Sequence, residues 1–318
     1  MKRLLNKKSV KGIAAIVLFA SFIALTAFSG MAGAATFILE GNVLRVGVSN
    51  TGGLIDDGFT VGIDYDKDGT AAWTTYDFLK PGSPFEFYSI GVNDLLDTTG
   101  YSNRSMDAFG ATSTNTSSGS ALAALTTGSF NGLDGTQVMT FLKDSGVIDF
   151  TITLRNSTEG TMTNLAYARG LDPDQDVYAG GGNSTTNDIP LPNLVTASAA
   201  TTNWTIGIKD VSGGGVPSVD SGWDQNPYNL FIPHNDGNGD YTINMAWQRA
   251  SLATGESWVI KFQYIIDDTK AGVVDPLTIT TPNLPSGDVG KPYSTVLAAT
   301  GGMPPYTWSD DGNLPPGL

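Results

Sequence analysis

The chain has 318 residues, no cysteine, a single histidine and a charged fraction of 15%. This length is typical of about two domains, and an apolar fraction of 40% excludes a chain that is disordered throughout. The lack of cysteine excludes disulfides, and with one histidine the chain offers too few soft ligands for a zinc or other transition-metal site.

The first 34 residues are typical of a Sec-type signal peptide. A basic stretch precedes the apolar run IAAIVLFASFIALTAF at 13–28, and Ala32 and Ala34 then form an A-x-A cleavage pattern. We expect cleavage after Ala34, because the apolar run is short for the alternative, an uncleaved membrane anchor. The protein is therefore expected to be exported, either to the extracellular medium or to the cell surface.

The mature chain is strongly acidic. Cleavage removes five of the 17 basic residues and leaves 12 against 31 acidic ones, a formal charge of −19. Such a surface repels nucleic acid and anionic lipid and suits divalent cations. No later run is apolar enough to span a membrane, so no transmembrane helix is expected in the mature chain. The partner classes that this leaves are glycans and other surface proteins.

Residues 36–275 are predicted to be all-β, as one large antiparallel β-sandwich or a supersandwich. In the run VIDFTITLR, Phe150, Ile152 and Leu154 share one face, which is the period of a half-buried antiparallel strand. Clusters of Gly, Asn, Asp and Ser separate such runs and predict turns. Short helices are compatible only with 92–96 and 120–126. Strands are expected at 42–49, 58–64, 85–92, 137–142, 147–155, 164–169, 204–209, 241–248 and 257–266.

The last 42 residues carry four motifs: LPSGDVGKPYS (284–294), LAATGG (297–302), PPYTWS (304–309) and LPPGL (314–318). They resemble the Ig-like domain family of bacterial surface proteins, which is similar to cadherin-like folds. The resemblance implies a non-catalytic spacer or adhesion module over 276–318. Such a domain normally runs to about twice this length, so we expect an incomplete Ig-like sandwich and a longer natural protein.

The stretch DYDKDGT at 64–70 resembles the first half of an EF-hand or dockerin-like calcium loop. Alternate residues of a tight loop point inward, so they can offer hard oxygen ligands to one Ca²⁺. The twelfth position holds Thr75 instead of a bidentate glutamate, and the flanks look like strands. The alternative is therefore a solvated acidic turn. The candidate ligands are Asp64, Asp66, Asp68, the carbonyl of Thr70, and Asp77.

Two further acidic clusters have the same character. LDPDQDVY places three aspartates in alternation after a predicted strand, and HNDGNGDY combines acidic and amide side chains with two glycines. Both are predicted as calcium sites, and an ordinary turn is the alternative for each. The candidate ligands are Asp172, Asp174 and Asp176 in the first, and Asp236, Asn238 and Asp240 in the second.

No catalytic residue is assigned. His234 stands alone, without a G-x-S-x-G elbow, P-loop or dinucleotide fingerprint. These observations favour an exported structural or adhesive protein whose acidic loops bind calcium. In size and strand content, 36–275 is also similar to the supersandwich of galactose mutarotase-like domains, which implies the alternative of a carbohydrate-binding or carbohydrate-active domain. Trp73, Trp223 and Tyr228 lie in loop-like sequence, where they could stack on sugars or simply pack.

Overall fold

The computed structural model describes residues 36–73, 76–102 and 109–267, parts of 278–300, and Trp308. The predicted signal peptide at 1–34, Thr75, the motif at 314–318 and all of the motif at 304–309 except Trp308 lie outside the described residues. The linker ahead of residue 278 lies outside them as well.

Strands dominate the described chain, which confirms the all-β prediction. Its two helices, η1 (Val177–Ala179) and α1 (Pro227–Leu230), are single turns, and no described helix is long and apolar enough to cross a membrane. The strands are β1 (Phe37–Glu40), β2 (Leu44–Val48), β3 (Ile63–Tyr65), β4 (Phe85–Val92), β5 (Leu95–Ser102), β6 (Thr112–Asn115), β7 (Ala121–Phe130), β8 (Leu133–Leu142), β9 (Val147–Asn156), β10 (Met162–Leu171), β11 (Thr185–Leu191), β12 (Leu194–Ala199), β13 (Thr205–Asp210), β14 (Val216–Asp220), β15 (Thr242–Leu252), β16 (Ser257–Asp267), β17 (Thr278–Ile279) and β18 (Ala299–Thr300).

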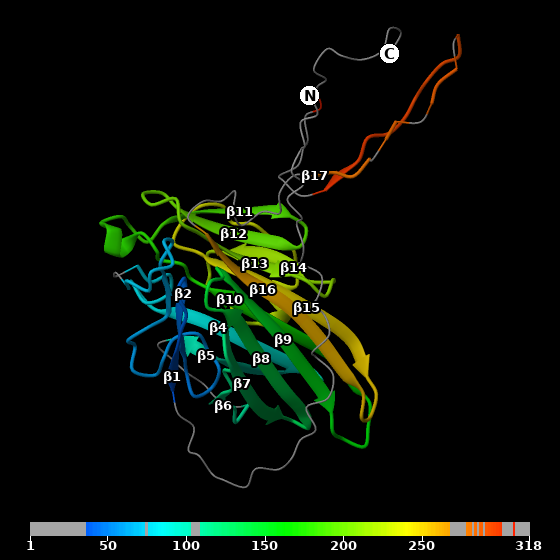
Figure 1. The fold of residues 1–318 in the computed structure, drawn as a ribbon. Helices are drawn as coiled ribbons and strands as arrows, with labels where there is room; N and C mark the ends of the chain where they lie inside the picture. Colours follow the sequence, from blue (N-terminus) through cyan, green and yellow to red (C-terminus); the bar gives the residue numbers. More distant parts are fainter. Residues whose placement is uncertain are drawn as a thin grey trace, which may run out of the picture. The chain divides into compact units, whose positions relative to one another are not determined.

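Two large antiparallel sheets form the body of the molecule (Figure 1). One has eight strands in the order β11-β12-β13-β16-β9-β8-β7-β6, and the other has five in the order β14-β15-β10-β4-β5. A third, three-stranded sheet has the order β1-β2-β3, and one apolar core joins side chains from all three sheets. Strands β17 and β18 pair with each other.

The predicted alternation is present in the eight-stranded sheet. In β9 the side chains of Phe150, Ile152 and Leu154 are buried, while Thr151 and Thr153 are half-buried. Phe150 stacks on Phe262 of the neighbouring β16 with ring centroids 4.6 Å apart. Burying one such aromatic side chain contributes about 1.5–3 kcal/mol, so this alternation orients the sheet toward its partner.

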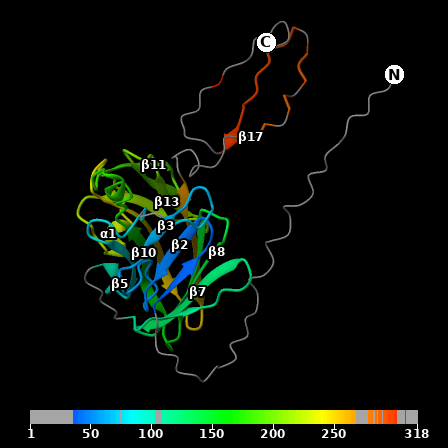
Figure 2. The same ribbon diagram turned by 60° about the vertical axis from the view of Figure 1, so that its left-hand side comes forward.

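Strand β4 and the second half of β10 are instead buried on both faces. Their inner face joins the main core, and their outer face belongs to a small second core of Phe85, Phe87, Ala168, Leu230 and Ala246. Helix α1 packs over β15, β10 and β4 and covers this outer face (Figure 2). Phe85 at the start of β4 and Leu171 at the end of β10 are therefore buried as well.

Two predicted helices and one predicted strand differ from the structure. Residues 120–126 fall largely within β7, where hydrogen bonds to β6 and β8 override the helix propensity of ALAAL. Residues 92–96 form the β4–β5 hairpin, with Asn93 and Asp94 both at positive φ, as a type I′ turn requires. Residues 58–64, expected as a strand, are turn or irregular until Ile63, where β3 begins.

Candidate metal centre

Three carboxylates meet where β10 leaves the five-stranded sheet and β15 enters it. The two strands are antiparallel, and Leu171 pairs with Ile243 at their ends. Continuing this register places Asp172 beside Thr242 and Asp174 beside Asp240. Oxygens of Asp172, Asp174 and Asp240 lie within 4.8 Å of one another.

Two of the three carboxylates are deeply buried and have no partner. Asp172 is 2% exposed and Asp174 is 1% exposed, while Asp240 is exposed. Within the described part of the chain, none of the four carboxylate oxygens of Asp172 and Asp174 forms a hydrogen bond. Their backbone N–H groups are used elsewhere, since Asp172 donates to the Phe85 carbonyl and Asp174 to the Phe78 carbonyl. The main chain is therefore fixed while the side-chain oxygens have no donor.

The electrostatics of the three groups are those of mutually repelling carboxylates. Burial, followed by the charges of Asp174 and Asp240, raises the pKa of Asp172 to about 9. Burial and the charge of Asp240 raise the pKa of Asp174 to about 7, and burial also raises the pKa of Asp240. All three pKa shifts disfavour the charged carboxylate. They arise from burial and from neighbouring negative charges, with no nearby positive charge among the described residues to offset them.

The other members of these two sequence clusters do not join the group. Asp176 begins the η1 turn and accepts hydrogen bonds from the backbone N–H groups of Thr201 and Thr202 at 2.6 and 2.9 Å. Burial opposes the ionisation of Asp176, but these donors outweigh it and lower its pKa. Asp236 accepts from the backbone N–H and the hydroxyl of Ser221, and the Asn238 Oδ1 accepts from the backbone N–H of Asn187.

The carboxylates of DYDKDGT are not brought together. Asp66 accepts from the backbone N–H groups of Asp68, Thr70 and Ala72 and from the Thr70 hydroxyl, so it caps its own turn. Asp68 is exposed and pairs only with Lys67 among the described residues, at 3.3 Å. The structure thus gives this loop the geometry of a capped turn.

Asp64 and Asp77 are both buried and form an antiparallel backbone bridge, separate from the group of Asp172, Asp174 and Asp240. Asp64 is buried and forms an ion pair with Arg45, whose Nε lies 2.8 Å from Oδ2. Burial and the charge of Asp77 raise the pKa of Asp64 to about 7, against the attraction of Arg45. Asp77 accepts hydrogen bonds from four backbone N–H groups, those of Gly62, Ile63, Leu79 and Lys80.

The interior of the sandwich holds a buried ion pair that the sequence analysis did not single out. Arg169 of β10 lies 2.5 Å from the Oε1 of Glu86 on β4, and both side chains are fully buried. Arg169 also donates to the Tyr264 hydroxyl and the Gln137 Oε1. The sequence does carry a signal for this pair. Each of the runs FEFYSIGV and NLAYARGL contains a single charged residue, Glu86 in the first and Arg169 in the second.

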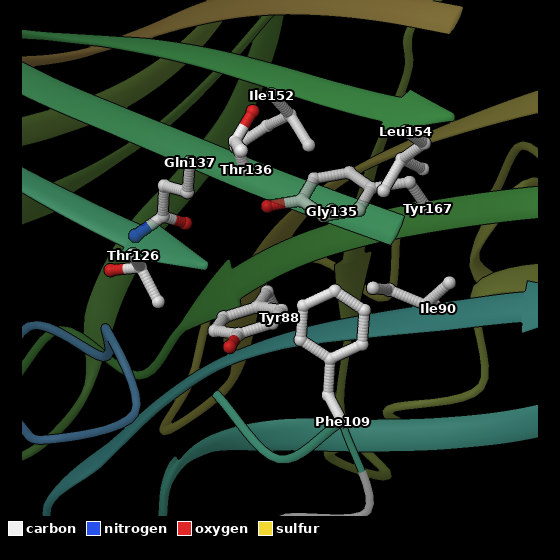
Figure 3. A pocket seen from close by; sticks show the side chains of 10 residues that line it. All are labelled: Tyr88, Ile90, Phe109, Thr126, Gly135, Thr136, Gln137, Ile152, Leu154 and Tyr167. Carbon is white, nitrogen blue, oxygen red and sulfur yellow. The ribbon is translucent and has the colours of Figure 1, made fainter. Parts of the chain in front are cut away.

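A cavity of about 10 Å³ lies close to this network, lined by Gln137, Tyr88 and Tyr167 among others (Figure 3). It has room for about one water molecule, so it cannot admit a substrate. Burial raises the pKa of Tyr167 to about 12, which keeps that phenol neutral. This cavity is therefore part of the packing and not an active site.

A larger, open groove of about 490 Å³ lies on the surface. Its lining is mostly apolar, and His234 is its one titratable side chain among the described residues. The His234 Nδ1 lies 2.7 Å from the Ile232 carbonyl, and its Nε2 lies 3.7 Å from an oxygen of Asp220. The groove has the size of a small-molecule site.

The three aromatic residues considered as a sugar platform are all engaged in packing. Trp223 lies against Phe85 at 5.2 Å, and its Nε1 donates to the Asp240 carbonyl. The Tyr228 hydroxyl donates to the Asn164 carbonyl, and Trp73 lies under the Arg45 guanidinium.

No protein-family model matches the chain, and no curated protein sequence matches it significantly. Among solved structures, it is similar to a GH36 alpha-galactosidase from Geobacillus stearothermophilus, with 11% identity and a TM-score of 0.40, over 75% of this chain and 40% of that one. The chain thus spans well under half of that enzyme. A galactose mutarotase related enzyme from Lactobacillus acidophilus has 10% identity and a TM-score of 0.40, over 74% of this chain and 98% of that one.

Proposed function

We propose that this chain is a calcium-binding β-sandwich module of an exported surface protein, with a structural or adhesive role. The observation that carries the proposal is the pair of buried, unpartnered carboxylates of Asp172 and Asp174 beside Asp240. The predicted signal peptide and the Ig-like motifs support the surface location.

The donor set fits calcium better than other ions. Carboxylate oxygens are hard ligands, and Ca²⁺ binds them at about 2.3–2.6 Å in flexible geometry. Two oxygens bound to one Ca²⁺ are therefore at most about 5 Å apart, and the three carboxylates meet this condition. The group contains no nitrogen or sulfur ligand, which disfavours zinc and copper.

Without an ion, the arrangement is costly. A buried polar group without a partner costs about 1–3 kcal/mol even when it is neutral, and a charged one costs more. Bound Ca²⁺ would offset this cost and hold the exit of β10 to the entrance of β15. In a chain without disulfides, such a clamp stabilises the sandwich where its strands end.

Thermal unfolding of the full mature chain at pH 8, with calcium and with chelator, tests the proposal. At free calcium about ten times Kd, linkage gives about 1.4 kcal/mol, which corresponds to a rise in Tm of about 3–6 °C for a domain of this size. Asp174→Asn should abolish the rise. In chelator this variant should be no less stable than the wild type, because it removes a repelling charge.

Asp68→Asn is the matched control, since it makes the same change at an exposed aspartate in the DYDKDGT turn. It should leave the calcium response intact. If Asp68→Asn abolishes the response and Asp174→Asn does not, the ion binds in the turn at 64–70 and the assigned site is wrong. If calcium shifts neither protein, the module does not depend on calcium.

The surface groove favours a second candidate function, the binding of a small neutral glycan. Its volume lies in the range of ligand sites, and its lining combines apolar side chains with the His234 imidazole and Asn235. A glycan array probed with the mature chain tests this function. Binding that is lost in Val216→Asp, at the groove wall, would support it, and an array without hits would exclude the glycans presented.

A further inference from the structure

Three carboxylates reach at most the lower limit of the coordination number of calcium. Ca²⁺ takes about 6–8 oxygen ligands, and Asp172, Asp174 and Asp240 supply at most six if every one binds through both oxygens. Since Asp172 and Asp174 are deeply buried, any remaining ligands on their side must come from nearby protein groups.

Gly82 marks where another side chain reaches the site. Its φ is +68°, and a Cβ at this position would lie 2.1 Å from the Asp174 Oδ2 and 2.8 Å from the Asn183 Nδ2. The ends of the Asp174 and Asn183 side chains therefore converge over the same face of Gly82. A residue with a Cβ would fill the space between them.

The Asn183 side-chain amide has no hydrogen-bond partner among the described residues. It is half-buried, and no hydrogen bond to or from its side chain is formed within the described ranges. Although it lies next to Asp174, that carboxylate also has no hydrogen-bond partner. A half-turn about χ2 exchanges the amide Oδ1 and Nδ2 without moving the backbone, and amide oxygens are regular calcium ligands.

We propose that Asn183 is the fourth protein ligand of the cation site and binds through its Oδ1, an inference that rests on the proposed function. The amide is neutral, so it adds a ligand without adding to the repulsion among the three carboxylates. It also completes the site from a third segment of the chain.

This ligand changes what the ion connects. Asp172, Asp174 and Asp240 flank β10 and β15 of the five-stranded sheet, whereas Asn183 lies two residues before β11 of the eight-stranded sheet. A cation held by all four residues therefore ties the two sheets together at one end of the sandwich. The edge strand β11 would be fixed by the ion as well as by its pairing with β12.

Calorimetric titration of the folded mature chain with CaCl₂ tests this assignment. Asn183→Ala should weaken calcium binding about tenfold, which corresponds to about 1.4 kcal/mol. Asn183→Asp should bind calcium more tightly than the wild type, because ligand charge raises calcium affinity. A purely structural hydrogen-bonding role would be impaired in both variants, so the opposite signs separate the two roles.

Ser184→Ala is the control, since Ser184 is the exposed neighbour of Asn183 in the same segment. It should bind calcium like the wild type. If Asn183→Ala also binds like the wild type while Asp174→Asn does not bind, the three-carboxylate site stands and the assignment of Asn183 is overturned. If the wild type itself does not bind calcium, the proposed function fails together with this inference.

Discussion

At the scale of single residues, the surroundings decide what an aspartate does in this protein. Asp66 and Asp176 each lie where several N–H and hydroxyl groups point at them, so they act as caps and their pKa values are lowered, although burial opposes both shifts. Asp172 and Asp174 follow the end of β10, where no donor reaches their carboxylates among the described residues. Four aspartates with the same D-x-D spacing therefore have two different roles.

Asp64 provides a pH-dependent test of this argument. Its folded pKa is raised from 3.8 to about 7, mainly by burial and then by Asp77. The protonated form is therefore favoured by folding, and this stability is fully present below about pH 4 and lost as pH rises through 7. In Asp64→Asn we expect a smaller loss of stability between pH 4 and pH 8 than in the wild type.

Urea unfolding at several pH values, with calcium held saturating, measures this difference. Asp68→Asn is the control, because that carboxylate is exposed, and it should keep the wild-type pH dependence. Identical slopes for the wild type and Asp64→Asn would show that Asp64 is already ionised in the folded protein across this range.

At the scale of strands, alternation was readable from the sequence only where one face is exposed. The alternation of Phe150, Ile152 and Leu154 with threonines predicted strand β9 from the sequence. By contrast, the two acidic clusters could not be joined from sequence, since the contact of Asp174 with Asp240 depends on the register of β10 with β15. That register belongs to the pairing of two whole strands that are far apart in the chain, so the two short acidic motifs do not by themselves reveal it.

Strand β10 can be tested through Gly170. A Cβ there would lie 2.0 Å from the Asn244 Oδ1 and 2.6 Å from the Phe87 ring, both in neighbouring strands. Gly170→Ala should therefore push β10 away from β15 and lower the unfolding free energy by about 1–3 kcal/mol. Because the candidate ligand Asp172 lies only two residues after Gly170, the calcium response of the Gly170→Ala protein should also be weaker than that of the wild type.

Urea unfolding and calcium titration of the same variant measure the two effects together. Gly160→Ala is the control, since a Cβ at Gly160 meets no atom within 4 Å. Unchanged stability in Gly170→Ala would mean that Asn244 and Phe87 can move aside, and the strand would then be looser than its packing indicates.

At the scale of the whole molecule, a polar network crosses the space between the two sheets. Glu86 and Arg169 come from the five-stranded sheet, while Gln137 and Tyr264 come from the eight-stranded one. The backbone N–H of Leu54 donates to the second oxygen of Glu86. The Arg169 guanidinium also lies over the rings of Tyr88 and Phe150. The network thus specifies one arrangement of the sheets, in addition to the apolar packing around it.

A double-mutant cycle on Glu86 and Arg169 tests how this network contributes. Removing one partner leaves a buried, uncompensated charge, so Arg169→Met should lower the unfolding free energy by about 3–5 kcal/mol. Glu86→Gln should also be destabilising, because it leaves the Arg169 charge uncompensated and turns an amide N–H donor toward the backbone N–H of Leu54. The double variant, measured by urea unfolding, should be more stable than the sum of the single losses predicts, since it buries no lone charge. Strict additivity would instead mean that water reaches the pair and screens it, and the sheets would then be held by their apolar packing alone.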